Sequence, residues 1–174
     1  GNTGALMAMC KIFLRPIDGI SRPAIAAYFP TITGESCMLD LGANIDCDAN
    51  NLVQFSFMGQ AFANIIMGIK NPKVSLLNIG EEEQKGLDYI KEASLILSSM
   101  KDKINYTGFI EGDKIAQGYS DVIIADGFTG NVALKTAEGT ANFITSELKQ
   151  ALTGNLIGKI SSLLNFFNLK KFKK

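Results

Sequence analysis

The chain has 174 residues, enough for one domain with a sizeable hydrophobic core. Its 17 Lys and Arg residues balance its 17 Asp and Glu residues, which argues against a nucleic-acid binder held by counterion release. Histidine is absent and the three cysteines form no CxxC motif, so Ser–His or Cys–His nucleophile pairs and histidine metal ligands are excluded, and neither a disulfide framework nor a zinc site is indicated.

The first part of the chain predicts a helix followed by two strands. Residues 1–4, Gly-Asn-Thr-Gly, form a glycine loop ahead of a helix over 5–14, a run of good helix formers that ends before a proline. A strand is predicted over 24–29, closed by Pro30. After a turn, a second strand over 37–41 runs into an acid, a glycine and an amide: Asp40, Gly42 and Asn44.

The middle of the chain alternates helices and strands. The stretch 50–67 is apolar around much of its circumference and predicts a largely buried helix, whose Met and Phe residues either pack as core or border an acyl-chain slot. A buried strand over 74–79 runs directly into the turn 80–86, which carries three glutamates and Lys85. A helix over 87–100 and a strand over 104–110 follow.

The stretch 120–145 carries the clearest functional signal. A short β-branched strand over 122–125 ends at Asp126, the glycine loop 127–131 follows, and helical spacing starts at residue 132. Such a loop at a helix start can hold phosphate, because the first turn has unpaired N–H groups and the positive end of the macrodipole. Asn131 would add a donor and Lys135 a cation. The alternative is structural: Thr129 or Asn131 caps the helix, and the glycine supplies only a turn.

Strands that alternate with helices at this spacing predict an α/β fold, a layered and mainly parallel sheet flanked by helices. Ligands of such sheets collect beyond the carboxyl ends of the strands. We therefore expect three turns to meet along one edge, with Asn2 and Thr3 nearby. Their residues are Asp40, Gly42, Asn44, Asn78, Gly80, Glu81, Glu82, Lys85, Asp126, Gly130 and Asn131.

The last part of the chain, 153–174, differs from the α/β core expected over 1–152. It predicts a protruding amphipathic helical segment followed by a tail with four lysines. A basic amphipathic helix can lie among the headgroups of an anionic membrane, and packing on a partner subunit is the equal alternative. The residues predicted to contact a membrane are Leu163, Phe166, Phe167, Lys170 and Lys171.

Six motifs occur in an order that strongly resembles the bacterial phosphate acyltransferases of the PlsX type. They are GNTGALMA, GISRPAIA, LDLGANIDC, QFSFMG, LLNIGEEEQKG and DGFTGNVALKTAEGTA. The resemblance covers nearly the whole chain. It implies a fold like that of isopropylmalate dehydrogenases and phosphotransacetylases. It also implies that the family's chain extends beyond this one at both ends, which fits a sequence that does not begin with Met.

The resemblance implies the reaction of acyl-[acyl carrier protein] with inorganic phosphate, giving acyl phosphate for phospholipid synthesis. It implies a cytoplasmic homodimer attached peripherally to the inner membrane, with the downstream glycerol-3-phosphate acyltransferase as a further partner. No cofactor is expected, and Asp and Glu at these spacings make no recognisable metal site. The alternatives are a phosphotransacetylase-like enzyme using short acyl-CoA, or an inactive truncated fragment that binds a membrane or a partner subunit.

Phosphate is already anionic at neutral pH and a thiolate leaves readily, so positioning and charge stabilisation suffice without histidine. We predict Lys85 and Asn131 as catalytic residues. Backbone amides of 127–131 and of the Asn2–Thr3 turn are expected to hold phosphate. No acyl-enzyme is expected, although Cys47 lies close to one of the turns. The predicted phosphate- or substrate-binding residues are Asn2, Thr3, Asn44, Asn78, Gly80, Glu82, Asp126, Thr129, Gly130 and Lys135.

Overall fold

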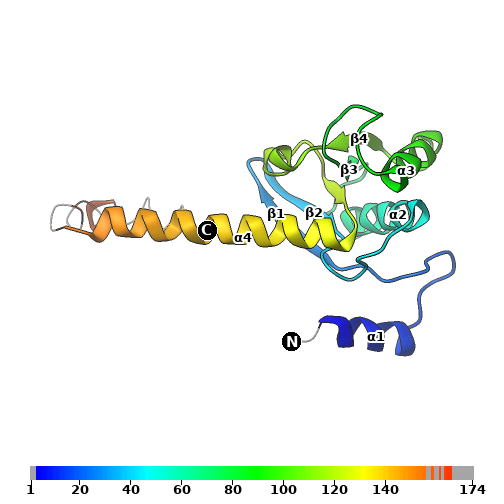
Figure 1. The fold of residues 1–174 in the computed structure, drawn as a ribbon, viewed down its shortest axis with the longest axis horizontal. Coiled ribbons are helices and arrows are strands. Elements are labelled where there is room, and N and C mark those ends of the chain that lie inside the picture. Colours follow the sequence, from blue (N-terminus) through cyan, green and yellow to red (C-terminus); the bar gives the residue numbers. More distant parts are fainter. Residues whose placement is uncertain (1–2, 156–157, 159–160, 162, 166–174) are drawn as a thin grey trace. The chain divides into compact units, whose positions relative to one another are not determined.

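The computed structural model describes residues 3–155, 158, 161 and 163–165. By its internal contacts the chain divides into two units, 1–133 and 134–174. The first unit contains the sheet (Figure 1) and the predicted catalytic and binding residues other than Lys135. The second contains most of a long helix. The predicted boundary after residue 152 stays a prediction.

In the part of the chain that the structure describes, five strands form one sheet in the order β1-β2-β5-β3-β4. Their bounds are β1 Ala26–Thr31, β2 Gly34–Leu39, β3 Val74–Leu77, β4 Tyr106–Ile110 and β5 Val122–Ile124. The pairs β2–β5, β5–β3 and β3–β4 are parallel, and only the hairpin β1–β2 is antiparallel. The predicted mainly parallel α/β sheet is confirmed.

Two predictions about strand ends were wrong. Pro30 lies inside β1 instead of closing it, because β1 is an edge strand and a proline there need not donate to a neighbour. The strands β2, β3 and β5 end one or two residues earlier than predicted. Asp40, Asn78 and Asp126 therefore lie beyond the strands, in the segments that follow them.

The helices are α1 Thr3–Phe13, α2 Ala49–Ile65, α3 Asp88–Ser99, the 3-10 helix η1 Gly112–Gln117 and α4 Gly127–Thr153. A capping box begins α2: Asn51 N–H donates to the Asp48 carboxylate, and the Asn51 side chain accepts from Asp48 N–H. The segment that follows β4 forms η1.

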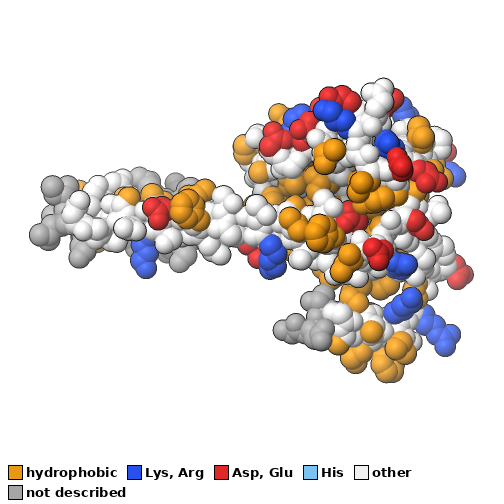
Figure 2. Space-filling view, viewed as in Figure 1, with side chains coloured by type: hydrophobic (Ala, Val, Ile, Leu, Met, Phe, Trp, Pro, Cys, Tyr) orange, Lys and Arg blue, Asp and Glu red, His pale blue; other side chains and the backbone are white. Residues whose placement is uncertain are grey.

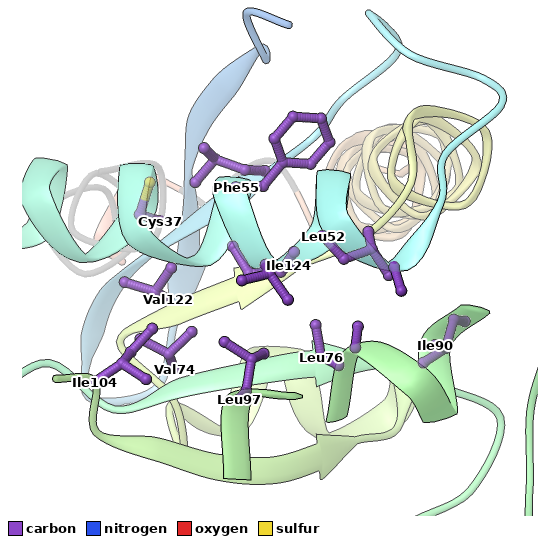
Figure 3. Close-up of a cluster of buried hydrophobic side chains, with 14 of the residues drawn as sticks. Cys37, Leu52, Phe55, Val74, Leu76, Ile90, Leu97, Ile104, Val122 and Ile124 are labelled. Carbon is purple, nitrogen blue, oxygen red and sulfur yellow. The ribbon is translucent and has the colours of Figure 1, made fainter. Parts of the chain in front are cut away.

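The core lies where α2 and α3 pack on one face of the sheet (Figure 3). Leu52 and Phe55 come from α2, and Ile90 and Leu97 from α3. They meet the alternate apolar side chains of β3 and β5 that face this side of the sheet, and these are all buried: Val74, Leu76, Val122 and Ile124. The buried helix predicted over 50–67 is α2, and most of its apolar residues contact this cluster, which is the core-packing alternative. Removing such side chains from water is the main favourable term in folding.

The surface mixes both signs of charge. Figure 2 shows Lys and Arg side chains interspersed with Asp and Glu on the visible face. Four ion pairs join described residues, and three of them span three positions along the chain. Within the described ranges, no helix is long and apolar enough to cross a membrane.

Candidate functional site

The three predicted turns meet at the carboxyl edge of the sheet. Their strands β2, β5 and β3 are neighbours, so the segments after them are adjacent. The N–H of Gly127 donates to the carbonyl of Asn44 at 2.7 Å, which joins the first turn of α4 to the turn after β2. Gly130 lies against the Asp40 carbonyl, where no side chain would fit.

Asp40 organises the turn after β2. Its side chain is fully buried and accepts from the backbone N–H groups of Ile25, Ala43 and Asn44 at 2.7–3.1 Å. The Asn44 amide donates both to Asp40 Oδ2 and to the Pro23 carbonyl, each at 2.8 Å. Because both amide hydrogens are used, Asn44 fixes the turn and has no side-chain hydrogen left for phosphate.

Asp126 organises the start of α4. Its carboxylate is 5% exposed and accepts from the backbone N–H of Thr129 at 2.8 Å and from the Thr129 hydroxyl at 2.7 Å. The hydroxyl of Tyr89, in the first turn of α3, donates a third hydrogen bond to Asp126 at 3.0 Å. Asp126 is thus the capping residue of α4, a role that the sequence alternatives had given to Thr129 or Asn131.

The glycine loop predicted over 127–131 is the first turn of α4, because Asp126 caps the helix and α4 begins at Gly127, five residues earlier than expected. The amides of Gly127, Thr129 and Gly130 are all engaged within the chain, by Asn44, the Asp126 side chain and the Asp126 carbonyl. Three of the five backbone N–H groups of 127–131 that we expected to hold phosphate are therefore occupied. Anion binding at this edge then depends on side chains and on the helix dipole.

The turn after β3 is closed by Asn78. Its amide donates to the carbonyls of Gly80 at 3.1 Å and Lys85 at 3.0 Å. Its Oδ1 is buried against Gly86 and has no hydrogen-bond partner among the described residues. Above Gly80 the side chains of Glu82 and Lys85 form an ion pair of 2.9 Å. Hydrogen bonding to Glu82 raises the pKa of Lys85, which therefore remains a cation at neutral pH.

Beside these turns lies an apolar cleft of about 620 Å³. Its walls are the first turns of α3 and α4, and its floor is the end of β3 at Leu77. Thr129 and Asn78 are its polar residues. The apolar lining consists chiefly of Leu77, Ile79, Leu87, Ile90 and Val132.

Asn131 follows the capped turn and is exposed. Its side chain lies next to Gly42, whose φ of +114° belongs to the turn after β2. Lys85 and Asn131 thus lie on turns of the same sheet edge, and no hydrogen bond between described residues links them directly. Lys135 pairs with Glu138 at 2.7 Å within the second unit. Asn2 lies outside the described residues, as does the Thr3 side chain.

Cys47 lies between the turn after β2 and α2, and its Sγ donates to the Asn44 carbonyl at 3.4 Å. Burial raises the pKa of this thiol to about 11. A nucleophilic cysteine needs a lowered pKa, so this surrounding does not activate Cys47 at neutral pH.

Sequence reasoning missed the α3 side of the site. Tyr89, Leu87 and Ile90 belong to a predicted helix whose apolar residues seemed sufficient to explain its packing. The only signal was their position directly after the turn 80–86.

Of the predicted membrane contacts, Leu163 is described and is 75% exposed. Phe166, Phe167, Lys170 and Lys171 lie outside the described residues.

Comparison with known proteins agrees with the sequence resemblance. The chain is 53% identical over 175 residues to a phosphate acyltransferase of Pelagibacter ubique (strain HTCC1062), covering all of this chain and 53% of that protein. It is 54% identical over 164 residues to a phosphate acyltransferase of Rhodospirillum centenum, covering 94% of this chain and 46% of that protein. The chain thus spans about half the length of these relatives.

Among solved structures, the EutD phosphotransacetylase from Staphylococcus aureus superposes with a TM-score of 0.62 over 81% of this chain and 49% of that one. A phosphotransacetylase from Streptococcus pyogenes gives a TM-score of 0.56 over 71% of this chain and 43% of that one. The identities, 17% and 19%, show a shared fold. The family model described as "Fatty acid synthesis protein" matches residues 1–174. The chain therefore belongs to the fatty acid synthesis protein family.

Proposed function

We propose that the intact protein transfers an acyl group from acyl-[acyl carrier protein] to inorganic phosphate, giving an acyl phosphate for phospholipid synthesis. The name of the relatives, phosphate acyltransferase, supports the acyl transfer and the phosphate acceptor. The structural observation that carries the proposal is the apolar cleft of about 620 Å³ beside the capped start of α4. An acyl chain fits its apolar lining, and the reacting carbonyl belongs near Thr129, close to the sheet edge.

The reaction is a displacement at the thioester carbonyl. A phosphate oxygen attacks the carbonyl carbon, a C–O bond forms, and the C–S bond breaks with its electron pair on sulfur. The thiolate is stable as a leaving group, so no strong base is required. The main demands are to hold two anionic reactants together and to stabilise the negative charge that develops on the carbonyl oxygen.

Lys85 and Asn131 are the side chains that we assign to these demands. Lys85 is a cation on the turn after β3, and its side chain is 52% exposed, so it can move from Glu82 to a bound anion. Asn131 is exposed beside Gly42 and can donate its amide hydrogens. The positive end of α4 adds a favourable field for negative charge at the same edge.

A phosphotransacetylase that uses short acyl-CoA is the second candidate, and the shared fold favours it. The size and apolar lining of the cleft favour a long acyl chain over an acetyl group. An acetyl group would leave most of its apolar lining in water, whereas a fatty acyl chain would bury this surface at about 25 cal/mol per Å².

The test measures acyl phosphate directly. The intact protein is incubated with inorganic phosphate and either long-chain acyl-[acyl carrier protein] or acetyl-CoA, and the product is trapped with hydroxylamine as the hydroxamate. We expect phosphate-dependent product from the carrier-protein substrate. Product only from acetyl-CoA would replace this function with the second candidate, and product from neither would contradict acyl transfer to phosphate.

We further propose that the protein is a cytoplasmic homodimer that attaches peripherally to the inner membrane through 153–174 and works beside the glycerol-3-phosphate acyltransferase. The amphipathic pattern and the exposed Leu163 and Leu164 support a contact of this segment with lipid. Flotation of the intact protein with anionic and with neutral liposomes tests the attachment. Equal recovery from both would contradict a role for the lysine tail.

A further inference from the structure

Large apolar side chains surround the mouth of the cleft. Ile79, Leu87 and Val132 are 79%, 59% and 48% exposed, whereas Leu77 and Ile90 beneath them are only 6% and 7% exposed. Exposed carbons around a concave apolar surface favour a ligand that removes them from water. Ile79, Leu87 and Val132 therefore form the rim of the cleft, and Leu77 and Ile90 form its floor.

One face of α4 and the start of α3 line the cleft from opposite sides. Thr129, Val132 and Ala133 stand at positions i, i+3 and i+4 of α4, so they lie on one helix face. Leu87, at the start of α3, stands on the opposite wall, and Ile90, three residues later, lies beneath it on the floor. A chain whose carbonyl lies near Thr129 must pass Val132 within the next helical turn.

Resting on the proposed function, we propose that this cleft selects the length of the acyl chain, with Val132 on its wall and Ile90 on its floor as specificity-determining residues. The physical basis is the number of methylenes held between the two walls. Each methylene excluded from the cleft lowers kcat/KM about fourfold, because burying one CH₂ is worth about 0.8 kcal/mol. A bulkier residue at position 132 shortens the usable cleft, and a smaller one at position 90 deepens it.

The test compares kcat/KM of the intact protein for short, medium and long saturated acyl chains on the carrier protein. Val132→Phe is expected to lower the ratio of long-chain to short-chain kcat/KM by at least about tenfold, since a few methylenes lose their place. Leu95→Phe is the matched control, because Leu95 is 74% exposed on α3 but lies outside the cleft. A chain-length profile that is the same in wild type, Val132→Phe and Leu95→Phe would overturn the proposal.

Ile90 also belongs to the core, so its variant must be mild. Ile90→Val removes one methylene from the floor and is expected to raise the long-chain to short-chain ratio about fourfold. If this variant does not fold, Val132→Ala provides the same direction of change on the wall. A shift of either folded variant toward shorter chains would contradict the assignment.

A binding measurement separates this proposal from the proposed function. Titration with the fluorescent fatty acid cis-parinaric acid reports on the cleft without turnover. Tighter binding by wild type than by Val132→Phe supports the cleft as an acyl site even if no acyl phosphate forms, in which case only the proposed reaction fails. Equal binding by both contradicts the acyl site itself, whatever the activity.

Discussion

The hydroxyl of Tyr89 donates a hydrogen bond of 3.0 Å to Oδ2 of Asp126, and this bond ties the first turn of α3 to the residue ahead of α4. The same two helix starts form the walls of the apolar cleft. Asp126 is 5% exposed, so each of its donors replaces water that the carboxylate has lost. The pair therefore holds the two walls of the cleft at a fixed separation.

Replacing Tyr89 by Phe is expected to lower the free energy of unfolding by about 1–2 kcal/mol, because a buried carboxylate loses one of its donors. Urea denaturation measures the change. Tyr106→Phe is the matched control: its hydroxyl bonds the neutral Ser94 hydroxyl at 2.8 Å, so its loss should be about 1 kcal/mol or less. A loss in Tyr89→Phe that does not exceed the control would contradict this role of the Asp126 carboxylate.

Alkaline pH provides a second test of Tyr89. Burial, followed by the charge of Asp126, raises the pKa of Tyr89 above its usual value. The unfolded chain releases the tyrosine proton near pH ~10 while the folded chain retains it, so the unfolding free energy falls as the pH rises above that value. Tyr89→Phe should show a shallower fall in urea titrations across this range. An unchanged slope would mean that Tyr89 titrates alike in both states.

Gly130→Ala tests the contact between α4 and the turn after β2. A Cβ at this position would meet the carbonyl oxygen of Asp40, which is part of a fixed backbone, so we expect a loss of more than about 2 kcal/mol. Gly139→Ala in the same helix meets no atom within 4 Å and should gain up to about 1 kcal/mol from helix propensity. Thermal or urea unfolding of both variants gives the comparison. A Gly130→Ala protein as stable as wild type would show that the two segments can separate.

Lys85→Ala and Asn131→Ala are expected to lower kcat of the intact protein by about 100-fold or more, because each removes a group assigned to the developing charge. Lys91→Ala is the control, since Lys91 forms an ion pair of the same spacing with Asp88 at 2.8 Å but lies outside the site. Circular dichroism confirms folding. Folded variants at positions 85 and 131 that retain most of their turnover would refute the assignment.

Cys47 is expected to take no covalent part in catalysis. Because burial raises its pKa to about 11, the thiolate is scarce at neutral pH and becomes abundant only as the pH approaches that value. Alkylation by iodoacetamide, followed by peptide mass spectrometry, should therefore accelerate steeply toward alkaline pH. Cys47→Ala should keep turnover within about threefold of wild type. A labelled acyl group trapped on Cys47 would contradict both expectations.

The sequence predicted the elements of the first unit well, because buried strands and helices leave strong apolar patterns. The edge strand β1 was misplaced, since Pro30 has a different meaning on an edge than at a strand end. The start of α4 was misplaced because Gly127 and Gly130 look like loop residues. In the structure both are helical residues without room for a side chain, because a Cβ would collide with the backbone of Asn44 at position 127 and of Asp40 at position 130.

The site was predictable in part. The rule that ligand-binding turns gather beyond the carboxyl ends of parallel strands predicts the meeting of the turns at Asp40, Asn78 and Asp126. It could not foresee which donors each acid uses, because hydrogen bonds such as that of Tyr89 with Asp126 join residues 37 positions apart. It could not foresee the cleft either, since a concave surface depends on how α3 and α4 are placed over β3.

The position of β5 in the middle of the sheet has a consequence for biosynthesis. The strands β2 and β3 are synthesised before β5. They do not pair with each other, and each pairs with β5, Val122–Ile124. Until that three-residue strand emerges, each nascent edge presents unpaired backbone groups to other chains. Chaperone protection of ribosome-bound intermediates is therefore most valuable just before residue 122 leaves the exit tunnel, and translation pausing there would favour aggregation.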